Sequence, residues 1–192
     1  MSPILGIIAS QNYSRVAPDT GAMFPLGMVQ VGSAGSSTIT FSSIPSTYTH
    51  LQLRVLARTT DTVENDDFAK IRFNSDSGNN YVQHSLYGTG AGAGAGVDRP
   101  NNAVFAQRLS TNKNAANIFG TFVLDILDYR NTNKYTTTRN IGGYDRNGGG
   151  QIFFESNLWQ DTSAITSITI TTSTGLNFTQ YSSFALYGIK GA

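Results

Sequence analysis

Residues 50–58 read His-Leu-Gln-Leu-Arg-Val-Leu-Ala-Arg and alternate between apolar and polar side chains. Successive side chains of an extended chain point to opposite faces. One face of this stretch therefore carries Leu51, Leu53, Val55 and Ala57. The other face carries Gln52, Arg54 and Arg58. This period of two predicts a half-buried β-strand with one side against a core.

Similar short β-rich runs recur from residue 27 onward, separated by turns of Gly, Asn, Ser and Asp. Residues 118–127 are apolar on both faces, which fits a central strand covered twice or a strand that faces a neighbouring subunit. Roughly ten strands at turn spacings of about eight to twelve residues predict an all-β fold, a jelly-roll-like antiparallel sandwich of two sheets. Further strands are expected at 28–31, 38–41, 68–73, 81–87, 104–109, 135–144, 152–154, 165–170 and 183–189.

Residues 90–96 form the repeat Gly-Ala-Gly-Ala-Gly-Ala-Gly. Side chains this small bury little apolar surface, and glycine adopts many backbone conformations. The repeat therefore predicts a pliable surface loop that lies outside the core.

Residues 1–26 differ from the sandwich domain predicted for residues 27–192. Their prolines oppose a continuous helix or a central strand, and their start lacks the basic segment of a signal peptide. We expect an extended N-terminal arm whose apolar residues form an interface: Ile4, Leu5, Ile7, Ile8, Met23 and Phe24. The arm either joins a sheet edge or groove of another chain or folds back over its own sandwich.

The composition narrows the function classes. Charged residues make up 13% of the chain, about half the usual share, which suits a surface partly covered by neighbours or a neutral Thr-rich domain. A net charge of +1 provides no strong field for nucleic acid, and no apolar run is long enough to span a membrane. The chain has no cysteine, so packing must hold the domain together without disulfides.

No constellation of catalytic residues is evident. His50 and His84 lack the spacing of a zinc site and are expected to make cross-strand hydrogen bonds. The acidic residues 61, 64, 66 and 67 lie close together and are expected in a solvated loop, and no turn has the ligand spacing of a calcium-binding EF-hand. No phosphate-binding loop or nucleophile elbow is present. We expect no catalytic residue, no metal, no cofactor and no enzymatic activity.

The aromatic residues suggest a second hypothesis. Sugars stack on exposed aromatic faces, although Tyr is also an ordinary strand residue. The candidates for a carbohydrate-binding surface are Tyr81, Tyr87, Tyr129, Tyr135, Tyr144, Trp159 and Tyr181.

Residues 41–54, 125–135 and 183–190, together with the Met-Ser-Pro-Ile-Leu-Gly-Ile-Ile-Ala-Ser start, resemble a group of tailed-bacteriophage virion proteins. The resemblance spans nearly the whole chain and implies a virion protein assembled in the cytoplasm of the host bacterium. It implies either a capsid decoration (cement) protein or a fibre or receptor-binding module that recognises host glycans.

Decoration is favoured over a fibre because the sequence has no heptads and no fibre repeats. The expected partners are the major capsid protein or other virion proteins and further copies of the chain, with a homotrimer expected by analogy with jelly-roll proteins.

We predict that deleting residues 1–10 leaves the sandwich folded but severely weakens oligomerisation or particle binding. Burying each large apolar side chain of the arm is worth about 1.5–3 kcal/mol, which offsets the ordering of the backbone only in a preformed groove. Thermal denaturation and particle binding of the truncated chain test this. A lower melting temperature with normal assembly would place the arm on its own domain.

Overall fold

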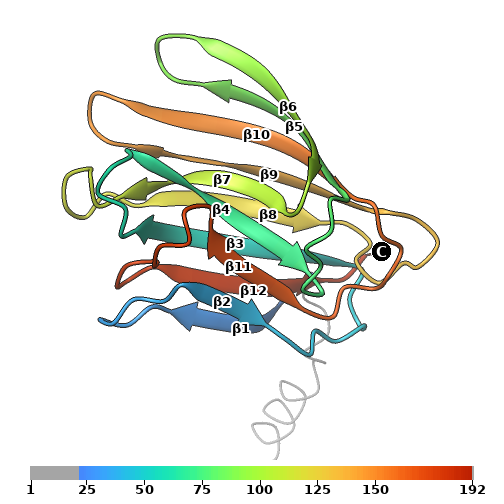
Figure 1. Cartoon of the computed structure of the whole chain (residues 1–192). Coiled ribbons are helices and arrows are strands. Elements are labelled where there is room, and N and C mark those ends of the chain that lie inside the picture. Colours follow the sequence, from blue (N-terminus) through green and yellow to red (C-terminus); the bar gives the residue numbers. More distant parts are fainter. Residues whose placement is uncertain (1–21, 192) are drawn as a thin grey trace, which may run out of the picture.

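The computed structural model describes residues 22–191, and its twelve elements within that range are all β-strands (Figure 1). The expected all-β class is confirmed. No helix in the described part of the chain is long and apolar enough to cross a membrane. The strands are β1 (Met23–Gln30), β2 (Thr38–Phe41), β3 (His50–Thr59), β4 (Asp66–Phe73), β5 (Tyr81–Gly88), β6 (Ala93–Asn101), β7 (Val104–Thr111), β8 (Gly120–Ile126), β9 (Thr136–Asp145), β10 (Gly150–Trp159), β11 (Ile168–Thr172) and β12 (Ser183–Ile189).

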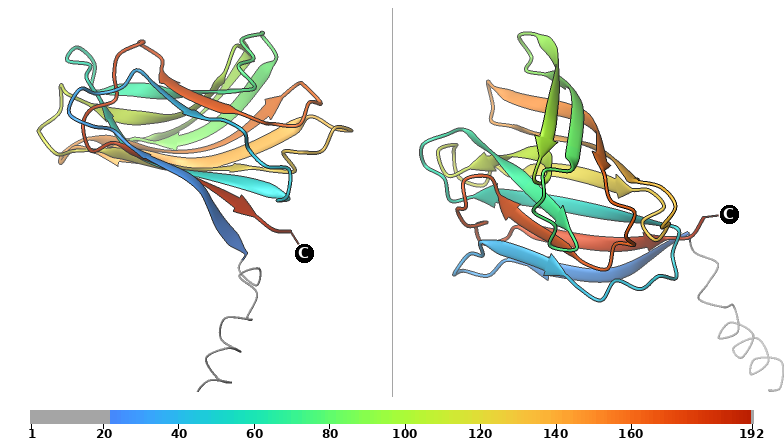
Figure 2. Two further views of the ribbon diagram at one scale, coloured as in Figure 1. Left: turned by 90° about the horizontal axis from the view of Figure 1, so that it is seen from below. Right: turned by 45° about the vertical axis from the view of Figure 1, so that its right-hand side comes forward.

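The strands form two layers of unequal width. The larger layer has the order β1-β12-β3-β8-β9-β10-β5-β6, and the smaller has the order β2-β11-β4-β7. The larger layer is curved, and the hairpin of β5 and β6 (green) rises at one end of it (Figure 2). The pairing is antiparallel except between β3 and β7, where Arg58 and Thr59 run parallel to Ser110 and Thr111 and join the layers. The sheet is therefore mixed, and the jelly-roll connectivity stays a prediction.

The core lies between the layers and follows the alternation that the sequence shows. Leu51, Leu53 and Val55 of β3 are buried, and they belong to one apolar cluster with Ile71 and Phe73 of β4. Because alternate side chains of each strand point inward, the period of two in residues 50–58 is the feature that builds this core.

One expectation near the core is wrong in detail. Arg58 is buried and does not face solvent: its Nη2 donates to the carbonyl oxygen of Asn114 at 2.9 Å, and its Nε donates to Asn112 Oδ1 at 2.8 Å. The reason is that β3 enters both layers at this end, so neither face of it is free. β8 is covered on its inner face only, because Thr121 is exposed and Val123 is half-buried on the outer face, and this excludes a strand covered twice within the chain. That its outer face meets a neighbouring subunit stays a prediction.

Only the first part of the Gly-Ala repeat forms the expected loop, because residues 90–92 connect β5 to β6. Residues 93–96 belong to β6, which pairs antiparallel with β5. An alternating sequence suits a strand even when both of its residues are small. Hydrogen bonds to β5 supply the order that side-chain packing does not.

The predicted boundary of the N-terminal arm at residue 26 is too late, because β1 begins at Met23. Met23 and Phe24 lie in β1 and pair with Ile189 and Gly188 of β12. The Phe24 ring packs against the Tyr48 ring, with 5.5 Å between ring centroids. Proline is tolerated here because β1 is an edge strand with a register shift after Pro25. Ile4, Leu5, Ile7 and Ile8 lie outside the described residues.

A carboxylate anchors the largest aromatic cluster. Trp159 and Tyr81 are 1% exposed and lie beside Phe73. The indole Nε1 donates to Asp76 Oδ2 at 2.7 Å, and Asn80 and the backbone of Gly78 each donate to the same carboxylate at 2.8 Å. Burial raises the pKa of Asp76, but the hydrogen bonds from Trp159, Gly78 and Asn80 outweigh it and hold this pKa below its usual value.

We predict that Asp76→Ala lowers the free energy of unfolding by about 1–3 kcal/mol, because the buried Trp159 N–H loses its acceptor. Because the pKa of Asp76 is lower in the folded chain than in the unfolded one, the ionised carboxylate stabilises the fold at neutral pH. This contribution to the free energy of unfolding is lost as the pH falls below about 4. Urea denaturation at pH 7 and pH 3 measures both effects. Asp145→Ala, which removes an exposed carboxylate from another turn, is the control and should cost less. An equal loss in both variants would contradict the role of the buried donor.

Candidate functional site

A cleft opens where the smaller layer ends. β7 is the last strand of that layer and contacts β9, β10 and β5 of the larger one. Past β7, a cavity of about 510 Å³ lies between β4 and β7 on one side and β10, β5 and β6 on the other. We call this the inter-layer cleft. Its lining residues are Phe68, Gln83, Ser85, Tyr87, Gly96, Val97, Phe105, Arg108, Gln151, Phe153 and Glu155.

Gly96 and Val97 are the β6 residues that line this cleft, and Gly94 lies on the same face of β6 as Gly96. Gly94 pairs with Tyr87 and Gly96 with Ser85, whereas Ala95 between them pairs with Leu86 on the opposite face. A Cβ on Gly94 would lie 2.5 Å from the Tyr87 hydroxyl oxygen, and one on Gly96 would lie 3.0 Å from Ser85 Oγ. The Tyr87 side chain therefore lies against bare backbone, and Gly96 leaves space that a larger residue would fill.

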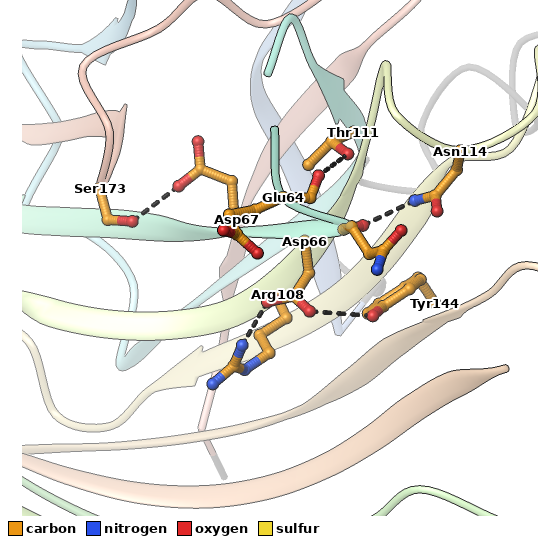
Figure 3. A network of polar contacts seen from close by, with 9 residues as sticks. Glu64, Asp66, Asp67, Arg108, Thr111, Asn114, Tyr144 and Ser173 are labelled. Carbon is orange, nitrogen blue, oxygen red and sulfur yellow. Dashed lines mark hydrogen bonds and ion pairs between the residues drawn. The ribbon is translucent and has the colours of Figure 1, made fainter. Parts of the chain in front are cut away.

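Arg108 connects the two layers at one side of the cleft. Figure 3 shows Arg108 and Tyr144 directed at the Asp66 carboxylate, which accepts from the guanidinium and, at 3.0 Å, from the Tyr144 hydroxyl. The guanidinium lies 4.4 Å from the Phe68 ring centroid and 5.8 Å from that of Phe153. Burial, with Asp66 next to it, raises the pKa of Tyr144 to about 12, so Tyr144 remains a donor. Arg108 is thus fixed in position and its charge is neutralised.

A buried carboxyl group lies beneath the polar side of the cleft. Glu155 of β10 is 1% exposed, and its two oxygens accept from Gln83 Nε2 at 3.0 Å and from Asn140 Nδ2 at 2.5 Å. Asn157 Nδ2 donates to Asn140 Oδ1 at 3.0 Å, which fixes the orientation of that amide. Burial raises the pKa of Glu155 to about 8, although Asn140 and Arg108 favour the ionised form.

This arrangement suits binding better than glycoside hydrolysis. Hydrolysis requires two carboxyl groups that face each other across a sugar. Glu155 is the single carboxyl group among the described side chains that line the cleft, and both of its oxygens are already bound.

The acidic residues 61–67 do not form the solvated loop that we expected. Asp66 and Asp67 belong to β4, and Asp61 and Asp67 are buried. Asp61 accepts from the Val63 backbone at 2.7 Å, and Asp67 accepts from Thr174 at 2.5 Å. Asp67 also accepts from Ser173 at 2.6 Å (Figure 3). Only Glu64 keeps an exposed side chain. Asp61 is therefore held by backbone amides of its own loop, and Asp67 by hydroxyl groups of the segment that follows β11.

The structure separates the aromatic candidates. Tyr81, Tyr129, Tyr144 and Trp159 are buried and cannot present a free ring. Tyr87, Tyr135 and Tyr181 are 37%, 49% and 64% exposed, and of these Tyr87 lines the inter-layer cleft. The phenylalanines that complete the cleft were not identified from the sequence, because they come from three strands.

The histidines have separate environments. His50 Nδ1 accepts from the backbone N–H of Asp128 at 2.9 Å, so its hydrogen bond joins β3 to the turn after β8 and not to a neighbouring strand. His84 is exposed on β5. Residues 22–191 contain no group of three or more His, Cys, Asp or Glu placed to hold a metal ion.

The outer face of the larger layer carries an apolar patch. Phe154 of β10 lies between Leu86 of β5 and Ile141 of β9 in the strand register, and Ile152 lies two residues before it. These four side chains are 50%, 60%, 53% and 59% exposed, respectively. We call them the outer apolar patch. Single exposed apolar side chains are ordinary, but a contiguous group on a sheet face is typical of a contact surface.

No protein-family model, no curated protein and no solved structure matches this chain.

We predict that Glu155 makes the stability of the protein depend on pH. The folded chain holds the Glu155 proton up to about pH 8, whereas the ordinary pKa is 4.5. Because this pKa is raised, Glu155 contributes to the free energy of unfolding in full below about pH 4.5. The contribution decreases as the pH rises to 8, by up to about 1.4 kcal/mol per pH unit. In Glu155→Gln this dependence should vanish, so the variant gains stability relative to wild type between pH 5 and 8.

Thermal denaturation across this range measures the difference between the two proteins. Glu64→Gln removes the same charge from an exposed side chain and serves as the control. A constant difference between Glu155→Gln and wild type would show that Glu155 ionises freely in the folded chain.

Proposed function

We propose that this chain is a non-enzymatic structural protein of a tailed-bacteriophage virion and that it decorates the capsid as a cement protein. The resemblance of residues 41–54, 125–135 and 183–190 to virion proteins supports this class. The low charged fraction of 13% also suits a surface that neighbouring proteins cover. The observation that carries the proposal is the outer apolar patch.

The patch has the properties of a protein-binding surface. Its four side chains lie on three adjacent strands, so the backbone beneath them is held by hydrogen bonds and needs little ordering on binding. Arg139 lies beside it and is exposed, and half-buried Asp125 pairs with Arg139 across the sheet, which gives the patch a polar rim. We assign the patch to the outer surface of the major capsid protein, with a homotrimer as the proposed state of the chain.

We predict that Ile141→Thr combined with Phe154→Thr weakens capsid binding at least tenfold. Each apolar side chain that is buried in a contact contributes about 1.5–3 kcal/mol. Because both side chains are half exposed in the isolated chain and Thr favours strands, the melting temperature should change little. Binding of purified protein to capsids assembled without it, followed by sedimentation, measures the effect.

Val63→Thr is the matched control, because Val63 is 69% exposed in a loop away from the patch. It should bind capsids as wild type does. The proposal is wrong if the double variant also binds as wild type, or if the labelled protein attaches to tails and not to heads.

A further inference from the structure

We propose that the inter-layer cleft is a binding site for a neutral saccharide, with one sugar ring seated against its aromatic side chains. The cleft lies between the layers, whereas the outer apolar patch lies on the opposite face of β5, β9 and β10. The inference therefore concerns a second activity, and it holds for the isolated chain whether or not that chain binds a capsid.

The cleft offers aromatic surface on two sides. Phe105 of the smaller layer is half-buried, and Tyr87 of the larger layer is 37% exposed. Behind them lie Phe68, whose ring meets that of Phe105 edge-on at 5.8 Å, and Phe153, whose ring centroid is 5.5 Å from that of Tyr87. The C–H face of a sugar packs on such rings and leaves its hydroxyl groups at the edge.

Polar groups with unused hydrogen-bonding capacity lie beside these rings. The side chains of Ser85 and Gln151 line the cleft, and neither has a side-chain hydrogen bond to another residue of the described range 22–191. Gln83 donates to Glu155, and its own side-chain oxygen is buried without a hydrogen-bond partner. A hydroxyl group both donates and accepts, so sugar hydroxyls suit a hydroxyl and two amides better than a purely accepting anion does.

The charges of the cleft favour a neutral ligand. Arg108 is the cation among the described lining side chains, and Asp66 already neutralises it while Phe68 covers one face of the guanidinium. Glu155 is buried beneath Gln83 and Asn140. An anionic ligand would therefore lose its hydration beside a guanidinium that Asp66 already pairs.

The space for the ligand adjoins the face of β6 that carries Gly96. The cavity of about 510 Å³ falls within the range of roughly 300–1,000 Å³ that small-molecule sites occupy. Gly96 has no positive backbone φ, so a larger residue is compatible with its strand conformation. Its added Cβ would meet only the Ser85 hydroxyl, which can rotate away, and further side-chain atoms would fill the cleft. The missing side chain at Gly96 thus leaves this part of the wall open.

Gly96→Val tests the site, and Ala95→Val is its matched control on the opposite face of the same strand. The purified full chain is titrated with four neutral probes: methyl α-glucoside, methyl β-galactoside, methyl α-mannoside and N-acetylglucosamine. Saturation-transfer NMR and calorimetry report binding. We expect at least one probe to bind with a dissociation constant on the order of 1 mM, as suits a ligand of this size.

Gly96→Val should weaken that binding at least tenfold without lowering the melting temperature, since valine favours strands, and Ala95→Val should bind as wild type does. Tyr87→Ala should weaken binding about 2- to 10-fold through the loss of ring stacking, whereas Tyr135→Ala, which removes an exposed ring outside the cleft, should not. Three results would overturn the proposal: no binding of any probe at about 50 mM, well above the expected dissociation constant; equal binding by Gly96→Val and wild type; or a preference for glucose 6-phosphate over the neutral probes. Because no capsid is present, these results are independent of the decoration proposal.

Discussion

The apolar core between the layers is built mainly from β3, β8 and β12 of the larger layer and from all four strands of the smaller one, β2, β4, β7 and β11. Four strands cannot cover eight, so the inner faces of β10, β5 and β6 extend past the last strand of the smaller layer. The inter-layer cleft follows from this mismatch. On the inner side the uncovered end becomes the inter-layer cleft, and on the outer side no strand covers the apolar patch.

Polar side chains hold the layers together where apolar contact ends. Arg108 crosses from β7 to the aromatic rings of both layers and pairs with Asp66. Deeper inside, Glu155 is bound by amides from β5 and β9. Such groups are stable in a protein interior only when they are hydrogen-bonded, and they fix one relative position of the strands more specifically than apolar contacts do. The cleft is therefore lined by side chains that are already held in place.

Local alternation could be predicted from the sequence, and its long-range consequences could not. Residues 50–58 identified β3 and its buried face, but the burial of Arg58 depends on the parallel contact with β7, which no local pattern encodes. The repeat at 90–96 has the period of a strand, but its small side chains gave no sign of a core-facing side. The position of its glycines opposite Tyr87 and Ser85 depends on the pairing of β6 with β5, which the sequence does not show. The assignment of Met23 and Phe24 to a strand likewise depends on their pairing with β12. The cleft combines five strands, so it could not be assembled from the sequence alone.

The two surfaces are coupled through the alternation of single strands. In β10, Phe153 and Glu155 point into the molecule while Ile152 and Phe154 point out, and in β5 and β6 the pairs Tyr87–Gly94 and Leu86–Ala95 divide in the same way. A one-residue slip would exchange the faces and bring Ile152 and Phe154 into the polar interior, so the buried Glu155 network also fixes the register of the outer patch. A partner that docks on the outer face leaves the cleft uncovered, because a sheet separates them. Assembly through one face and saccharide binding through the other are therefore compatible in the same molecule.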